Sequence, residues 1–64
     1  MATDERLMTL REVAEMLGVP PSTLYAWRYR GEGPSGYRIG RHVRYRRAKV
    51  EAWLERQVDQ RIAG

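Results

Sequence analysis

Arginine is the residue type in this chain that is most suited to binding a ligand, and most of the arginines lie within residues 28–49. This block holds eight of the twelve basic residues and one acid, Glu32, which gives it a net charge of +7. The rest of the chain has four basic and seven acidic residues, a net charge of −3. The guanidinium group binds phosphates and guanine edges through paired hydrogen bonds. The block therefore predicts a nucleic-acid-binding surface, with a solvated basic surface as the alternative. Tyrosines accompany the arginines at Tyr25, Tyr29, Tyr37 and Tyr45.

The chain offers little for catalysis or metal binding. It has no cysteine, and its single histidine, His42, lies within the basic block. Disulfides and a Cys/His zinc site are therefore excluded. A chain of 64 residues is also too short to build the walled pocket that a pair of catalytic carboxylates needs. We therefore expect neither an enzyme nor a cofactor.

Length and hydropathy limit the organisation of the chain and its location. A chain of this size makes one domain with a small core, because it buries only about 60% of its unfolded surface. No apolar run approaches the length of a membrane span, and no signal peptide is visible. We expect a cytoplasmic, nucleoid-associated protein that does not engage a membrane.

Helix signals come first along the chain. Thr9 followed by Glu12 is a capping-box pattern that predicts a helix beginning at Leu10, and Gly18 is suited to end that helix. After a turn of about three residues, a proline can open a second helix, which Gly31 stops. Two short helices joined in this way match a helix-turn-helix, whose second helix enters the major groove. An αα-hairpin used only for packing has the same spacing and remains the alternative.

The region around Arg41 reads as a β-hairpin. Tyr37-Arg38-Ile39 and Val43-Arg44-Tyr45 mirror each other about this residue, which predicts a Gly40-Arg41-His42 loop. Ile39 would then pair with Val43, Tyr37 with Tyr45 and Arg38 with Arg44, so that the four apolar and aromatic side chains pack on the helices. Like charges directly opposite are unfavourable. A bound polyanion would relieve the pairing of Arg38 with Arg44, although both side chains could instead splay into water.

A third helix is predicted from about Ala48 to Arg61. Its buried stripe would contain Val50, Trp53, Leu54 and Val58, and we expect Trp27 of the second helix in the core as well. On another face, Glu51, Glu55 and Asp59 form a row at i, i+4 spacing, which is either a solvated face or a contact for a basic neighbour.

The predicted fold is mostly α with a small β-hairpin, a winged helix-turn-helix made of a helix-turn-helix, a two-stranded wing and a C-terminal helix. Residues 7–61 would form this domain, between a flexible N-terminus of residues 1–6 and a tail of residues 62–64.

In this order, the segments resemble the excisionase-type, MerR-like family of winged helix-turn-helix proteins, also called recombination directionality factors. The resemblance covers residues 7–56. The matching segments are Leu10-Arg11-Glu12-Val13-Ala14-Glu15-Met16-Leu17-Gly18-Val19, Ser22-Thr23-Leu24-Tyr25-Ala26-Trp27, Tyr37-Arg38-Ile39-Gly40-Arg41-His42-Val43-Arg44-Tyr45-Arg46 and Val50-Glu51-Ala52-Trp53-Leu54. One departure is Pro20-Pro21, where many members have a polar cap before the second helix.

The resemblance implies a module that binds double-stranded DNA, with a recognition helix in the major groove and a wing at an adjacent minor groove or the backbone. Arg41 at the wing tip is suited to a narrow minor groove, where the negative potential is enhanced. Arg44 is also expected to contact phosphates. The recognition-helix contacts would be Ser22, Thr23, Tyr25, Ala26, Arg28 and Tyr29; the wing contacts Arg38, Arg41, His42 and Arg44; and further phosphate contacts Arg46, Arg47 and Lys49.

By the same resemblance, the protein would be an excisionase that binds tandem sites cooperatively, bends DNA and directs an integrase toward excision. A small transcriptional regulator would use the same contact residues, so both interpretations stay open. We also expect head-to-tail self-association on DNA, because the charge is split between two regions of the chain. A protein-binding adaptor, docking a basic partner on the acidic row, is a third possibility.

Overall fold

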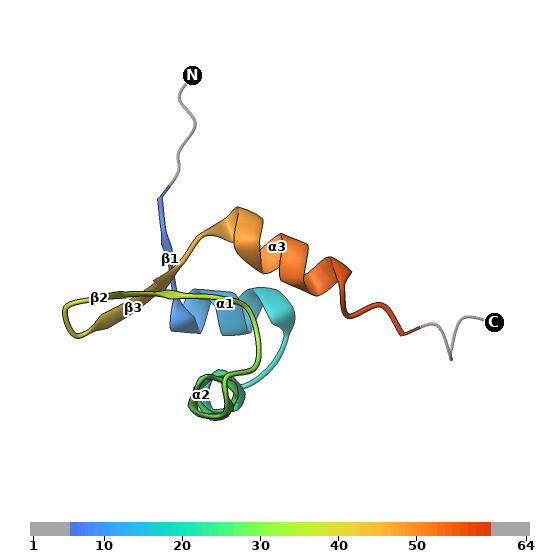
Figure 1. Ribbon diagram of the computed structural model, residues 1–64, viewed down its shortest axis with the longest axis horizontal. Helices are drawn as coiled ribbons and strands as arrows, with labels where there is room; N and C mark the ends of the chain where they lie inside the picture. Colours follow the sequence, from blue (N-terminus) through green and yellow to red (C-terminus); the bar gives the residue numbers. More distant parts are fainter. Residues whose placement is uncertain (1–5, 60–64) are drawn as a thin grey trace, which may run out of the picture.

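The computed structural model describes residues 6–59, which form three helices and a small antiparallel sheet (Figure 1). This arrangement is that of a winged helix-turn-helix, as the sequence predicts. Along the chain, the elements are β1 (Met8–Thr9), α1 (Leu10–Leu17), α2 (Pro21–Arg30), β2 (Tyr37–Ile39), β3 (His42–Tyr45) and α3 (Arg47–Glu55).

Reciprocal capping fixes the start of α1. The backbone N–H of Glu12 donates to Oγ1 of Thr9 (3.1 Å), and the backbone N–H of Thr9 donates to Oε1 of Glu12 (2.8 Å). Gly18 ends the helix in the left-handed conformation, with φ of 74°. Both predicted boundaries are therefore confirmed. Leu10, Val13 and Ala14 are buried on one side of this helix.

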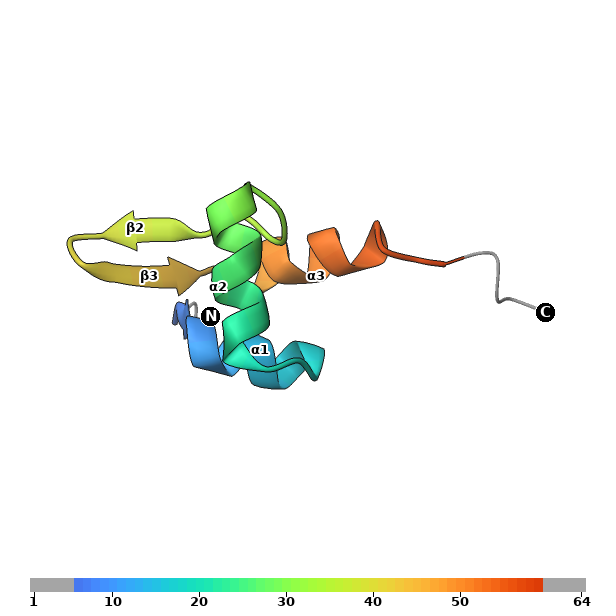
Figure 2. The ribbon, with the colours of Figure 1, turned by 90° about the horizontal axis from the view of Figure 1, so that it is seen from below.

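The turn between the helices consists of residues 18–20, as predicted, and it places α2 across α1 (Figure 2). Pro21 occupies the first turn of α2, where a backbone N–H would have no acceptor within the helix, so proline costs no hydrogen bond there. Gly31 ends α2 with φ of 73°. Leu24 is buried and anchors α2 on the core, while Trp27 is half-buried beside it.

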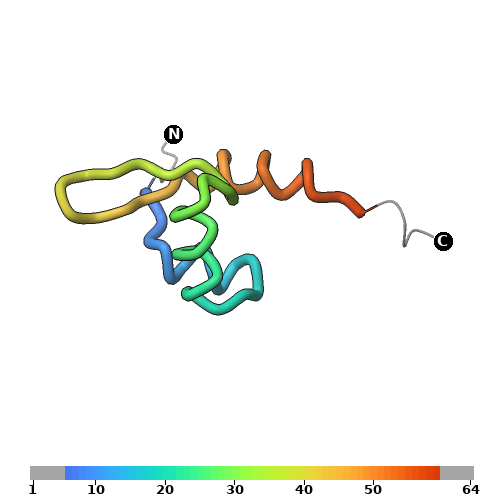
Figure 3. The backbone as a smooth tube through the Cα atoms, turned by 60° about the horizontal axis from the view of Figure 1, so that its bottom comes forward, coloured from blue at the N-terminus to red at the C-terminus, as the bar shows by residue number. Residues whose placement is uncertain are grey.

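The sheet has the strand order β1-β3-β2, so β3 lies in the centre and pairs with both neighbours. β2 and β3 form the wing, which projects from the body of the molecule (Figures 1 and 3). The third strand, β1, is not among the sequence predictions. It is two residues long, and it pairs Met8 with Tyr45 and Thr9 with Arg44.

The predicted register of the wing is wrong by one residue. Ile39 pairs with His42, Arg38 with Val43, and Tyr37 with Arg44. The connection is therefore the two-residue turn Gly40-Arg41, in place of the predicted three-residue loop. Gly40 has φ of 61° and no residue other than glycine has a positive φ within the described range, as in a type II′ turn. This turn matches the twist of a hairpin better than the longer loop does.

The observed register places on two faces of the wing the four side chains that the sequence predicts on one face. Val43 and Tyr45 face the core, with Tyr45 only 1% exposed, whereas Tyr37 and Ile39 lie on the opposite face and are partly exposed. Arg38 is opposite Val43, so the predicted pairing of Arg38 with Arg44 does not exist.

Close packing at the base of the wing supports this arrangement. A Cβ added to Gly36 would lie 2.9 Å from the ring of Tyr45, so only glycine allows the chain to pass this close to the buried ring. The loop before β2 is thereby held against the inner face of β3.

The third helix ends at Glu55, earlier than predicted. Val50 is fully buried, but Leu54 is 44% and Val58 65% exposed, so the predicted stripe is wrong beyond Trp53. Asp59 lies after the helix and does not extend a helical row from Glu51 and Glu55. The predicted end at Arg61 and the tail of residues 62–64 lie outside the described residues, as does most of the predicted N-terminus.

Two tryptophans connect α2 to α3. The rings of Trp27 and Trp53 lie 5.4 Å apart, at an angle of 47° to each other. Both side chains are half-buried, so the expectation that they belong to the core is met only in part. Their contact holds α3 against the end of the recognition helix. The buried core itself is small: Met8, Leu10, Val13, Ala14, Leu24, Tyr45 and Val50.

Candidate nucleic-acid interface

The outer face of α2 carries small hydroxyl groups and tyrosines. Ser22, Tyr25 and Tyr29 are exposed, and Ala26 lies between them on the side of the helix away from Leu24. Tyr25 is 60% and Tyr29 93% exposed, so both rings are available to a partner. The predicted recognition residues therefore line one accessible face, except Thr23 and Arg28, which lie at its borders.

The wing presents arginine at its tip. Arg41 is the second residue of the type II′ turn and is exposed. Nε of Arg38 donates to the carbonyl oxygen of Gly40 (3.4 Å), which holds this side chain along the hairpin. Arg44 donates from Nη1 to the carbonyl oxygen of Val43 (2.9 Å) and is half-buried. The wing arginines thus have different settings, although the sequence presents them as equivalent.

A hollow of about 280 Å³ joins the recognition helix to the wing. Four predicted contact residues line it together: Tyr25 from α2, and Arg41, His42 and Arg44 from the wing. One further basic residue, Arg11 of α1, also lines it and is absent from the predicted contacts. Arg11 lies outside the basic block, and only the packing of α1 beneath the wing brings it to this site. The complete lining is Thr9, Leu10, Arg11, Tyr25, Arg41, His42, Val43 and Arg44.

Arg28 lies where α2 meets the sheet. Burial raises the pKa of the Tyr45 hydroxyl above its usual value, while the positive charge of Arg28 opposes this shift. Arg28 is exposed and is close enough to act on a buried group of β3. It therefore borders both the recognition face and the root of the wing.

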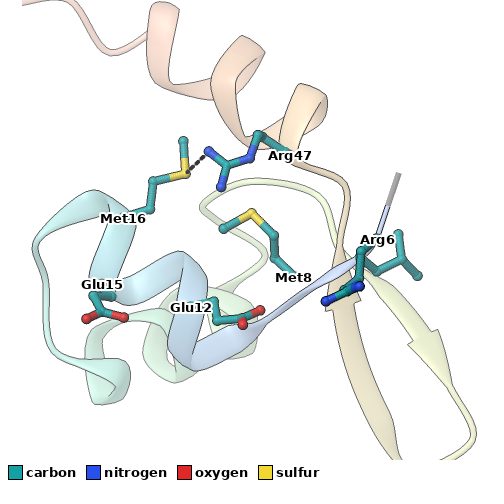
Figure 4. Close-up of a pocket in the computed structure, with 7 residues that line it drawn as sticks. Arg6, Met8, Glu12, Glu15, Met16 and Arg47 are labelled. Atoms are coloured by element: carbon teal, nitrogen blue, oxygen red, sulfur yellow. Dashed lines mark hydrogen bonds between the residues drawn. The ribbon is translucent and has the colours of Figure 1, made fainter. Parts of the chain in front are cut away.

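The three predicted phosphate contacts near α3 do not form one cluster. The guanidinium carbon of Arg46 lies 5.8 Å from the centre of the Tyr37 ring. Arg47 points to the other side, where Nη1 lies 3.8 Å from Sδ of Met16 (Figure 4). The same nitrogen lies 4.0 Å from a Glu51 carboxylate oxygen. Lys49 is exposed on α3. Arg47 is thus separated from the hollow between α2 and the wing.

A second hollow, of about 450 Å³, lies on the side of Arg47, between β1, α1 and α3 (Figure 4). Its lining contains Glu12 and Glu15 as well as Arg6 and Arg47, so the formal charges of its side chains cancel. The first hollow, by contrast, is lined by three arginines and no acid.

A cluster of metal-binding side chains and a helix that could span a membrane are both absent from residues 6–59. This part of the chain contains no group of three or more histidine, aspartate or glutamate side chains that could bind a metal ion. None of its helices has the length and the apolar character needed to cross a membrane.

Comparison with known proteins agrees with this geometry. No curated protein and no solved structure matches the chain. A model of the helix-turn-helix domain family matches residues 7–58, which include both helices, the wing and α3. The chain therefore belongs to the helix-turn-helix domain family, a DNA-binding family that includes excisionase-like proteins, and it binds double-stranded DNA in a sequence-specific manner.

Proposed function

We propose that this protein is an excisionase, an accessory factor that binds tandem DNA sites cooperatively, bends the DNA and directs an integrase toward excision. The protein itself performs no bond chemistry in this role. Its contribution is the shape that it gives to the DNA at the recombination site.

The observation that carries the proposal is the basic hollow shared by α2 and the wing. Tyr25 and Arg41, which belong to the two reading elements, line the same hollow. A duplex that contacts both elements presents two neighbouring grooves to one side of the protein. Bending the duplex toward this surface increases the contacts, which offsets the elastic cost of deforming it. The resemblance of residues 7–56 to excisionase-type proteins supports the same function.

The size and the charge distribution of the chain support the proposal of cooperative binding. A domain this small covers little DNA, so a single copy binds weakly. The wing and the end of α3 lie at opposite ends of the molecule (Figures 1 and 2). Glu51 and Glu55 are exposed on α3, while the wing is basic. These two carboxylates suit a head-to-tail row in which they lie near the basic wing of the next copy.

The decisive experiment is footprinting with gel-shift analysis on the DNA that surrounds the gene, at low and high salt. Protection of several evenly spaced sites beside an integrase attachment core would support an excisionase. Protection confined to a promoter would favour a transcriptional regulator. Absence of protection at both salt concentrations would contradict both and favour a protein-binding adaptor.

A further inference from the structure

We infer that the hollow between α1, Tyr25 and the wing is a binding site for a phosphodiester group of the DNA backbone, and that Arg11 is its anchor. This inference rests on the proposed DNA-binding surface and assigns a ligand group to one part of it. Arg11 belongs to the first helix, which the predicted contacts do not include.

The position of the hollow determines which part of DNA can reach it. Major and minor grooves are separated by one sugar–phosphate strand. With α2 in the major groove and the wing tip in the next minor groove, that strand must pass between Tyr25 and Arg41. The hollow lies between these two residues. Its volume of about 280 Å³ is slightly below the range of about 300–1,000 Å³ for small-molecule pockets.

The charges of the lining select an anion. Arg11, Arg41 and Arg44 contribute to it, and no acid does. Within residues 6–59, the guanidinium groups of Arg11 and Arg41 make no hydrogen bond or ion pair. Glu15 lies one turn beyond Arg11 but makes no ion pair with it and lines the other hollow. Two arginines are thus available for charge-assisted hydrogen bonds to a phosphate.

The location of Arg11 within α1 is unfavourable for the helix alone. It is the second residue of α1, directly before Glu12. At this end the helix macrodipole favours acids and disfavours cations. Glu12 satisfies that preference and also completes the capping box. Arginine at this position therefore gains nothing from the helix dipole, whereas a bound anion would give its charge a role.

The test compares Arg11→Gln with Arg56→Gln. Both variants lose one arginine charge, but Arg56 is exposed at the end of α3 and outside the hollow. Glutamine retains good helix propensity, and Arg11→Gln should leave Tm unchanged or slightly raised. The probe is a duplex that the wild-type protein selects from a random pool.

We expect Arg11→Gln to bind this duplex about tenfold more weakly at low salt. The slope of log affinity against log salt should fall in magnitude by about 0.9, the value for one lost phosphate contact. Arg56→Gln should keep the wild-type affinity and slope. Equal losses in both variants, or a wild-type slope in Arg11→Gln, would overturn the inference. A lower Tm with an unchanged slope would identify a structural role instead.

Phosphate alkylation identifies the contacted group. Alkylating one phosphate at the boundary of the two occupied grooves should weaken wild-type binding more than it weakens Arg11→Gln binding, because the variant has already lost one contact to that phosphate. The same interference pattern for both proteins would contradict the assignment. An NMR titration separates DNA from a free anion as the ligand. If the signal of the Arg11 guanidinium group shifts to a plateau with inorganic phosphate but does not shift with the duplex, the hollow binds a free anion and the inference is wrong. Failure of the wild-type protein to select any duplex would instead contradict the proposed function itself.

Discussion

Arg41 is the residue whose role is simplest to isolate, because it lies at the tip of the wing and outside the core. We predict that Arg41→Ala weakens DNA binding by about tenfold or more, since a guanidinium group in a narrow minor groove gains from the enhanced negative potential. Circular dichroism and Tm should remain those of the wild type. Unchanged DNA affinity in a folded variant would show that the tip does not contact DNA.

Tyr45 couples the stability of the fold to alkaline pH. Burial raises the pKa of its hydroxyl above the usual value, and the Arg28 charge opposes the shift without cancelling it. The unfolded chain therefore ionises first as pH rises. The stabilising contribution is complete below the unfolded pKa of about 10 and is lost as pH rises through the higher folded pKa.

The variant Tyr45→Phe should remove this component of the alkaline decline. Urea unfolding of both proteins from about pH 8 to about pH 11 measures the effect, since this range brackets the tyrosine pKa. The difference in unfolding free energy between wild type and variant should change above about pH 10. A constant difference over the whole range would mean that Tyr45 ionises equally easily in the folded and unfolded chains.

Single residues also show what sequence can and cannot reveal about the site. Residue types and spacing predict the second helix and the wing, and the structure brings four of the predicted contact residues to one hollow: Tyr25, Arg41, His42 and Arg44. The place of Arg11 in this hollow could not be predicted, because it depends on a tertiary contact between α1 and the wing. The different settings of the other arginines, such as Arg47 against Met16, also depend on packing that no local pattern encodes.

At the scale of elements, α3 depends on Trp53 for its attachment to α2. We predict that Trp53→Ala destabilises the fold by about 3 kcal/mol, near the lower end for a large aromatic residue, because the side chain is only half-buried. That loss is comparable with the entire stability of a small domain. Leu54→Ala is the matched control, since 44% of Leu54 is exposed. Equal, small effects in a denaturant titration would show that the Trp27–Trp53 contact contributes little.

The helices were predictable to the residue at three of their ends because the signals are local. Thr9 with Glu12, Gly18 and Gly31 each act on the backbone within one turn, and tertiary packing does not override them. The wing register depends on turn geometry as well as on the pattern of side chains. The mirror pattern about Arg41 suggested three loop residues, whereas the positive φ of Gly40 permits a two-residue turn.

The sequence predictions also differ from the structure at β1 and at the end of α3, and both differences have physical causes. Two residues are too few to display the alternation that identifies a strand, so β1 left no signal in the sequence. The end of α3 was misplaced because Val58 and Asp59 continue the helical spacing, although neither contributes to the buried core. The spacing of apolar residues predicts a helix for as long as the spacing continues. The helix itself is stable only where its side chains pack on the core.

At the scale of the whole molecule, the separation of charge is the property most relevant to assembly. We predict that Glu55→Lys reduces the cooperativity of binding to tandem sites, because it places a positive charge where the basic wing of a neighbouring copy would lie. Affinity for a duplex with a single site should not fall. Gel-shift titrations on one-site and two-site duplexes measure both quantities. An unchanged Hill slope would rule out this electrostatic contact between copies.

Because β3 is the central strand, the wing is fixed at its base and free at its tip. At the base, Arg44 of β3 pairs with Thr9 of β1 on one side of the strand and with Tyr37 of β2 on the other. The tip of the wing is supported only by the hairpin itself, where Ile39 pairs with His42. Bending forces from the tip are therefore resisted at the base, beside the core. We therefore expect a load on the tip to deflect the turn more than the base, and to leave the orientation of α2 unchanged, because Leu24 holds that helix on the core.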